Sequence, residues 1–126
     1  MGKFYWLLTA SIFINFSNLA EAAQSKSIAQ ILSVGCEAAA SAQKNELGSI
    51  TSQRDCLRTG INAINDNFTD FSVLYPACAA AKSYFAIQNY NENKRDSENV
   101  FKACIQSGSA LSQDTQLKTL VIKLGE

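Results

Sequence analysis

The sequence contains no histidine, only one proline and no glycine-rich phosphate loop. Histidine is the commonest general base and the commonest neutral metal ligand, so Ser-His-Asp and Cys-His catalytic sites are excluded. Carboxylates are present, but they gather in polar stretches that solvent is expected to surround, where acid–base catalysis is not expected. We therefore expect a protein that is not an enzyme, binds no metal, needs no cofactor and acts by binding.

Charge is balanced, because 11 lysine and arginine side chains stand beside 11 aspartate and glutamate side chains. The sequence has no basic stripe of the kind that binds nucleic acid or an anionic membrane surface. Alternation of apolar and polar residues, the pattern of a half-buried strand, is also missing, whereas apolar residues recur at helical spacing. The chain is therefore predicted to be all-α, with no nucleic-acid partner.

The first 22 residues have the pattern of a secretory signal peptide. Lys3 supplies the positive charge, residues 4–16 are almost wholly apolar, and Ala20 and Ala22 place small side chains before the cleavage point. A retained membrane anchor is the alternative, but this apolar run is shorter than the roughly 20 residues that span a bilayer. We expect cleavage to leave a single domain at residues 23–126, periplasmic or secreted, with no membrane span.

The four cysteines, Cys36, Cys56, Cys78 and Cys104, lie at near-regular intervals in an otherwise helical pattern. Export and an even cysteine count predict two structural disulfides, whereas a zinc site would usually carry close C-x-x-C pairs, which are missing here. Turn-prone stretches between consecutive cysteines would return all four sulfurs to one layer of a bundle, within reach of one another. Bridges along hairpins (Cys36–Cys56, Cys78–Cys104) and nested bridges (Cys56–Cys78, Cys36–Cys104) both fit the spacing. The diagonal pairing would cross the core and is the least expected.

The first two predicted helices are separated by a turn at Gly48. The first runs from about residue 25 or 27 to residue 44, with Ser27 as its N-cap, and Gly35 inside it would let a neighbouring helix come close. Ser49 would cap the second helix, which is expected to bury one apolar stripe. That stripe consists of Ile50, Leu57, Ile61, Ile64 and Phe68.

The third predicted helix follows a turn at residues 66–70. A short helical stretch capped by Thr69 or Asp70 comes first, and the main helix restarts at Pro76, because proline suits a first helical turn. It is expected to end near residue 90. The turn also contains the glycosylation sequon Asn67-Phe68-Thr69, which matters only in a eukaryotic source.

Two further helices complete the predicted fold. Asp96 or Ser97 would cap the fourth, which Gly108 would end, and the last would run from about residue 112 to residue 124. Its apolar face must be buried against the bundle or against a partner; it consists of Leu117, Leu120, Val121 and Leu124. We predict a disulfide-stapled antiparallel four-helix bundle with a short additional C-terminal helix.

The most polar stretch, residues 91–98, is expected to form a long loop between the third and fourth helices. It carries both signs of charge, and Cys78 and Cys104 would anchor the helices on either side. A solvated connection without a further role is the plainer interpretation of such a charge cluster. If the protein binds a protein partner, we expect this loop to make the contact. Its candidate partner-binding residues are Glu92, Lys94, Arg95, Asp96 and Glu98.

Four stretches of the chain carry a family resemblance. They read ILSVGC at residues 31–36, SYFAIQNY at 83–90, VFKACI at 100–105 and LKTLV at 117–121. This pattern resembles the periplasmic immunity proteins that neutralise type VI secretion amidase effectors, although Cys56 and Cys78 have no counterpart in it. The resemblance implies a small, secreted, helical protein that plugs the active-site cleft of a cell-wall-cutting enzyme. It also implies that Cys36 and Cys104 are partners, and thereby favours the nested bridges.

Two other functions stay open from the sequence. A secreted carrier would hold a small apolar ligand among aromatic side chains within the bundle, whereas an envelope structural or chaperone-like protein would form a homodimer through its last helix. The aromatic set of the carrier consists of Phe71, Tyr75, Tyr84, Phe85 and Phe101. The immunity role instead requires a secreted hydrolase or toxin as the partner.

Overall fold

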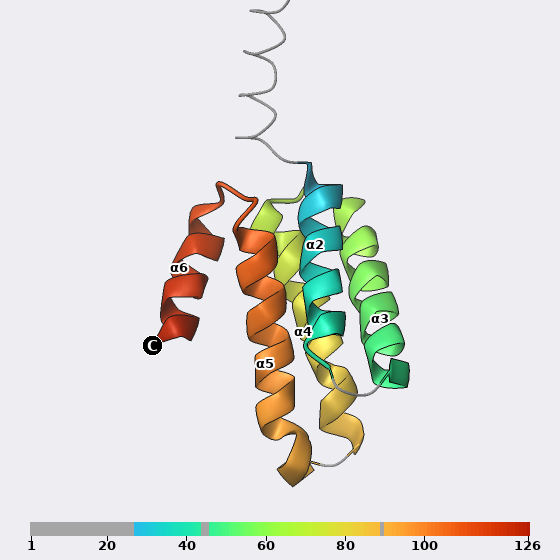
Figure 1. Ribbon diagram of the computed structural model, residues 1–126. Coiled ribbons are helices and arrows are strands. Elements are labelled where there is room, and N and C mark those ends of the chain that lie inside the picture. Colours follow the sequence, from blue (N-terminus) through green and yellow to red (C-terminus); the bar gives the residue numbers. More distant parts are fainter. Residues whose placement is uncertain (1–26, 44–45, 89) are drawn as a thin grey trace, which may run out of the picture.

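The computed structural model describes residues 27–43, 46–88 and 90–126, with only the backbone described within 84–95. These residues form five helices and no strand: α2 (Ile28–Ser41), α3 (Glu46–Ile64), α4 (Asp70–Gln88), α5 (Tyr90–Ser109) and α6 (Thr115–Gly125). Successive helices run in opposite directions, and α2 to α5 form a bundle with α6 against one edge (Figure 1). The predicted fold class is confirmed. The expected signal peptide at residues 1–22 lies outside the described residues.

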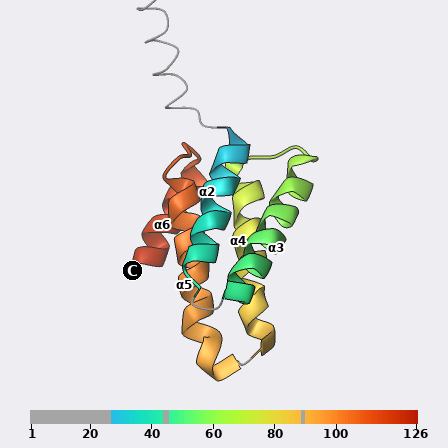
Figure 2. The ribbon, with the colours of Figure 1, turned by 45° about the vertical axis from the view of Figure 1, so that its right-hand side comes forward.

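The arrangement of the helices leaves the two edges of the bundle in different environments. Helices α2 and α4 contact each other and also contact both α3 and α5, whereas α6 packs on α5 and α4. Helices α3 and α6 therefore lie at opposite edges (Figures 1 and 2). Within the described ranges, no helix packs against the outward side of α3. Among the same residues, no helix combines the length and apolarity that a membrane span needs.

The core consists mainly of small and medium-sized apolar side chains in the middle of the bundle. Ser27 caps α2 as predicted, because its hydroxyl accepts a hydrogen bond from the Gln30 N–H at 3.3 Å. Along α2, apolar residues at helical spacing face the interior of the bundle. The core residues, all at most 2% exposed, are Ile31, Leu32, Cys36, Ala39, Cys56, Val73, Leu74, Ala77, Cys78, Ala81, Val100, Cys104, Ile105 and Leu117.

The predicted inner face of α3 is wrong. The helix begins at Glu46, so Gly48 lies inside the first turn and Ser49 is not the cap. The buried positions recur at every fourth residue and carry small side chains: Gly48, Ser52, Cys56 and Gly60. Most of the stripe predicted to be buried is exposed, since Ile50 is 58% exposed, Ile61 55% and Phe68 42%. Only Leu57 and Ile64 of that stripe are partly buried against the core.

Close packing explains why small residues occupy the inner face of α3. A Cβ added to Gly60 would overlap the side chain of Leu32 on α2. Ser52 donates a hydrogen bond to the carbonyl oxygen of Ala81 on α4 at 3.1 Å and accepts one from Gln43. Larger side chains would hold α3 away from both neighbours, so the bulky apolar residues are left on its outer and lateral sides.

Helix α4 is continuous, which corrects the predicted restart at Pro76. Thr69 caps the helix as expected, since its hydroxyl accepts a hydrogen bond from the Ser72 N–H at 3.1 Å. Pro76 lies inside the helix and lacks the N–H that would bond to the carbonyl of Ser72. Because Ser72 is exposed, water can satisfy that carbonyl.

Helix α5 begins at Tyr90, so the predicted loop at residues 91–98 is instead the first half of a helix. Neither Asp96 nor Ser97 is its N-cap. Gly108 lies inside the last turn of α5 and does not end the helix; a Cβ there would come within 2.6 Å of a Leu74 methyl carbon. Gly108 therefore serves close packing.

Candidate functional site

The four cysteines form two buried disulfides that follow the helix hairpins. Cys36 on α2 bonds to Cys56 on α3, and Cys78 on α4 bonds to Cys104 on α5, each with a Cα–Cα distance of 5.6 Å. All four residues are 0% exposed. The sequence left the hairpin and nested pairings open, and the structure has the hairpin pairing. The nested pairing implied by the family resemblance is wrong.

The two bridges meet in the centre of the bundle. Cys56 Sγ lies 3.9 Å from Cys104 Sγ, although their helices α3 and α5 stand across the bundle from each other. The expectation that chain reversals would bring the sulfurs into one layer is confirmed. Gly35 contributes to this layer as predicted, because a Cβ there would lie 3.1 Å from the carbonyl oxygen of Cys104. The disulfides therefore fix the spacing of all four bundle helices at one level.

The α4–α5 hairpin extends beyond the ends of helices α2 and α3 at the same end of the bundle (Figures 1 and 2). The Cys78–Cys104 bridge ties its two helices together within the core, and the fully buried Ala81 and Val100 lie between this bridge and the hairpin tip. From Cys78 to the end of α4 at Gln88 is about 15 Å, at 1.5 Å per helical residue. The hairpin is therefore a projecting structure whose two helices are covalently cross-linked within the core.

The structure places the five candidate partner-binding residues on this hairpin, along the first half of α5. Asp96 is half-buried and Glu98 is exposed, and Ser97 between them is buried. The side chains of Glu92, Lys94 and Arg95 lie outside the described residues. The stretch predicted to be a loop is helical.

Two aspartates join the other end of the bundle to α6. Asp114 caps α6 by accepting hydrogen bonds from the N–H groups of Gln116 (2.8 Å) and Leu117 (3.3 Å). Its second oxygen accepts a bond from the Phe71 N–H at the start of α4, at 3.0 Å. Asp70 accepts a bond from the Ser112 hydroxyl at 2.6 Å. Sequence reasoning missed Asp114, although an aspartate immediately before an apolar-periodic segment is a usual N-cap signal.

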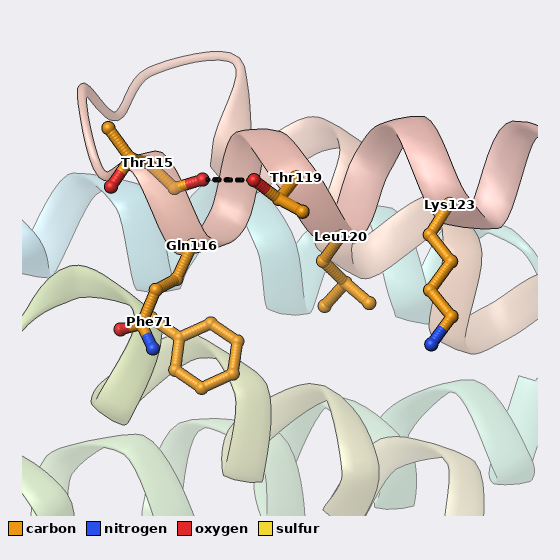
Figure 3. Close-up of a pocket in the computed structure, with 6 residues that line it drawn as sticks. All are labelled: Phe71, Thr115, Gln116, Thr119, Leu120 and Lys123. Atoms are coloured by element: carbon orange, nitrogen blue, oxygen red, sulfur yellow. Dashed lines mark hydrogen bonds between the residues drawn. The ribbon is translucent and has the colours of Figure 1, made fainter.

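Helix α6 and α4 enclose an open groove of about 340 Å³. Figure 3 shows the ring of Phe71 on α4 and the side chains of Leu120 and Lys123 on α6 directed into the space between the helices. Thr115, Gln116 and Thr119 form the rest of the wall, and the Thr119 hydroxyl is held by the Thr115 carbonyl oxygen at 2.9 Å. The groove thus has an apolar floor, a polar wall and one cationic side chain.

An aromatic row lies beside this groove. The rings of Phe71 and Tyr75 are stacked with centroids 5.2 Å apart, and Tyr75 meets the edge of Phe101 at 5.6 Å. The Lys82 ammonium group lies 5.5 Å from the centre of the Phe101 ring. Three of the five aromatic residues assigned to an apolar-ligand site therefore come together at the surface; the side chains of Tyr84 and Phe85 lie outside the described residues.

The apolar face of α6 is used within the chain. Leu117 is fully buried, and Leu120, Val121 and Leu124 pack half-buried against the core. The same helix is tied to the end of α5 by a bond from the Lys118 ammonium group to the Ser109 carbonyl oxygen, at 2.9 Å. Of the two outcomes expected for this face, burial against the bundle is the one observed.

Comparison with known proteins adds no further assignment to this geometry. Neither the protein-family models, nor the curated proteins, nor the solved structures yield a match to this chain.

Proposed function

We propose that this chain is an exported, non-catalytic binding protein of the bacterial periplasm, and that it acts as an immunity protein against a type VI secretion cell-wall amidase. The α4–α5 hairpin would enter the active-site cleft of the amidase and block the approach of peptidoglycan. Residues 92–98 would supply polar contacts of both charge signs to the rim of that cleft.

The observation that carries this proposal is the Cys78–Cys104 bridge, which cross-links the two helices of the projecting hairpin within the core. An inhibitor that fills a cleft loses less conformational entropy on binding when its inserted element is already rigid. The bridge fixes the hairpin, and its contact with the Cys36–Cys56 bridge connects the hairpin to the rest of the bundle. Two buried disulfides are also typical of a protein that folds in an oxidising compartment.

The test is an inhibition assay with the protein purified after export from a bacterial host. A type VI secretion amidase is incubated with purified cell-wall sacculi, and the release of new amino groups is measured with and without the protein. The proposal predicts stoichiometric inhibition and a stable complex in gel filtration. Unchanged amidase activity across a panel of such enzymes would contradict the immunity role.

Charge-reversal variants locate the contact within the protein. Lys94→Glu combined with Arg95→Glu should weaken inhibition at least about tenfold, because like charges that face each other across an interface oppose binding. Lys102→Glu, an exposed reversal further along the same helix, is the matched control and should inhibit normally. Equal inhibition by all variants would exclude the hairpin tip as the contact surface while leaving inhibition itself intact.

The groove between α4 and α6 favours a second candidate function, the carriage of a small apolar ligand. The apolar floor at Phe71 and Leu120 would contact the ligand body, and Lys123 would favour an anionic head group. Native mass spectrometry of the exported protein should then show a bound small molecule that Leu120→Asp removes. A mass equal to that of the protein alone, after purification without detergent, would speak against carriage.

A further inference from the structure

One apolar surface of the bundle has no helix against it within the described ranges. On the outward side of α3, Leu47 is 69% exposed, Ile50 58% and Ile61 55%. Leu57 and Ile64, at the edge of this surface, are half-buried and pack partly against the core. We call these five residues the outer stripe. With Arg54 included, their positions advance in alternating steps of three and four residues, the spacing of a seam that packs against another helix.

The residues of the outer stripe share one side of α3. Each helical residue turns the side-chain direction by about 100°, which places the stripe on the side of α3 away from Gly48, Ser52, Cys56 and Gly60. Helix α6 covers the opposite edge of the bundle (Figure 1). An apolar patch of this kind on an otherwise polar helix surface is characteristic of a protein–protein contact.

The charges beside the outer stripe indicate the chemistry of its partner. Arg54 lies within the stripe and Arg58 one turn further along the same side, and both are exposed. Arg54 pairs with Asp55 at 3.8 Å, but the two side chains are 61% and 38% exposed, so this pair adds little to stability and exchanges readily. Carboxylates on a docked segment would therefore find two arginines beside an apolar seam.

A second copy of the chain fits this surface less well. Parallel pairing of two α3 helices would set Arg54 directly against Arg54 of the other copy. Antiparallel pairing with Ile50 opposite Ile61 would bring the two Arg54 residues within about 4.5 Å along the helix axis. Both arrangements bring arginines of the two copies to nearly the same level of the seam, and like charges placed there oppose association. The observations therefore favour a different protein with acidic side chains.

We propose that the outer stripe of α3 docks an amphipathic helix of a partner protein, whose apolar seam is flanked by aspartate or glutamate. The stripe would contact the apolar seam, and Arg54 and Arg58 would pair with the flanking carboxylates. This inference goes beyond the proposed function, because the stripe is separate from the α4–α5 hairpin and does not depend on an amidase.

The test uses two synthetic helical peptides and the protein purified after export. Both peptides contain about three heptads with leucine at the seam positions; one has glutamate at the flanking positions and the other has lysine. Isothermal titration calorimetry at low salt should show that the glutamate peptide binds at least about tenfold more tightly than the lysine peptide. Arg54→Glu combined with Arg58→Glu should reverse this preference.

Apolar contact is tested separately from charge. Ile50→Glu combined with Ile61→Glu should lower the affinity for the glutamate peptide at least about tenfold, since it places like charge on the seam. Ile122→Glu on α6 is the matched control, because Ile122 is 68% exposed but lies outside the stripe; its affinity should equal that of the wild type. Circular dichroism verifies that each variant folds.

Three outcomes would overturn the proposal. They are failure of the glutamate peptide to bind, equal affinity for both peptides, and unchanged affinity in the Ile50→Glu, Ile61→Glu variant. Light scattering provides a further check: a dimer of the wild-type protein that Ile61→Glu dissociates would assign the stripe to a second copy and reject the acidic partner. None of these results depends on whether an amidase is inhibited.

Discussion

Cys56 Sγ and Cys104 Sγ lie 3.9 Å apart, although the two residues belong to different disulfides and to helices on opposite sides of the bundle. The two bridges are therefore in van der Waals contact in a fully buried layer. Thiol–disulfide exchange requires a thiolate to reach a disulfide sulfur. The structure places one potential attacking sulfur next to the other bridge.

Replacement of Cys36 should allow disulfide exchange between the two bridges, which can be measured. In Cys36→Ala, Cys56 is a free thiol, and its thiolate can attack the sulfur of Cys104. The Cys56–Cys104 bond forms, the Cys78–Cys104 bond breaks, and Cys78 leaves as the thiolate, with no external oxidant or reductant. After acid quenching, unfolding and alkylation, peptide mapping should find the label on both Cys56 and Cys78.

The control for exchange is the double variant Cys36→Ala, Cys56→Ala, which has no free thiol and should take up no label. If Cys36→Ala were labelled at Cys56 alone, even after long incubation at neutral pH, contact between the bridges would not lead to exchange.

Loss of the Cys78–Cys104 bridge should lower stability markedly. Paired replacement, Cys78→Ala with Cys104→Ala, avoids a stray thiol and removes a cross-link that spans 26 residues. Loop-closure entropy predicts a loss of about 3 kcal/mol in the free energy of unfolding. Urea denaturation in non-reducing buffer measures this loss, and a midpoint equal to that of the wild type would show that the bridge is not structural.

Asp114 should contribute more to the stability of the fold than its position near the surface indicates. It accepts bonds from two N–H groups at the start of α6 and from the Phe71 N–H of α4. Asp114→Ala should cost about 1–2 kcal/mol, since it removes an N-cap and a tie between two helices. Thermal unfolding measures the effect against Asp66→Ala, an exposed aspartate in the α3–α4 turn. Equal stability of the two variants would show that the α6 cap is dispensable.

Gly60 should be intolerant of even one extra carbon. Alanine favours a helix over glycine by roughly 0.5–1 kcal/mol, but a Cβ at this position overlaps the buried side chain of Leu32. Overpacking of this kind costs about 1–3 kcal/mol, so we expect Gly60→Ala to be destabilising. Gly125→Ala, where a Cβ meets nothing within 4 Å, is the control. A melting temperature at or above that of the wild type for Gly60→Ala would mean that α2 and α3 do not pack as closely as described.

The caps Ser27 and Thr69 and the cysteine layer were predictable because each depends on local chemistry. Ser27 and Thr69 bond to N–H groups three residues further along the chain, an interaction that sequence spacing alone reveals. The common level of the sulfurs followed from the turns between cysteines. Which sulfurs bond was not predictable, because the hairpin and nested pairings satisfy the same spacing.

The errors arose where tertiary packing overrides local pattern. Helix α3 has both an apolar stripe and a small-residue face, and hydrophobicity alone selects the stripe as the inner face. The bundle selects the small face, because Leu32 needs the space at Gly60. The polar composition of residues 91–98 predicts a loop, yet α5 begins at Tyr90 and includes this stretch. A polar sequence can continue a helix whose apolar face begins only further along, at Val100.

The pairing of the cysteines is the most direct test of the account, because the rigid hairpin and the inter-bridge contact both depend on it. Trypsin cleavage after Lys44, Arg54, Arg58, Lys82, Lys102 and Lys118 separates all four cysteines into different peptides. Mass spectrometry of a non-reduced digest should detect residues 55–58 linked to the peptide that contains Cys36, and residues 59–82 linked to residues 103–118. A link between the peptides of Cys36 and Cys104, or four free thiols in the exported protein, would contradict the account.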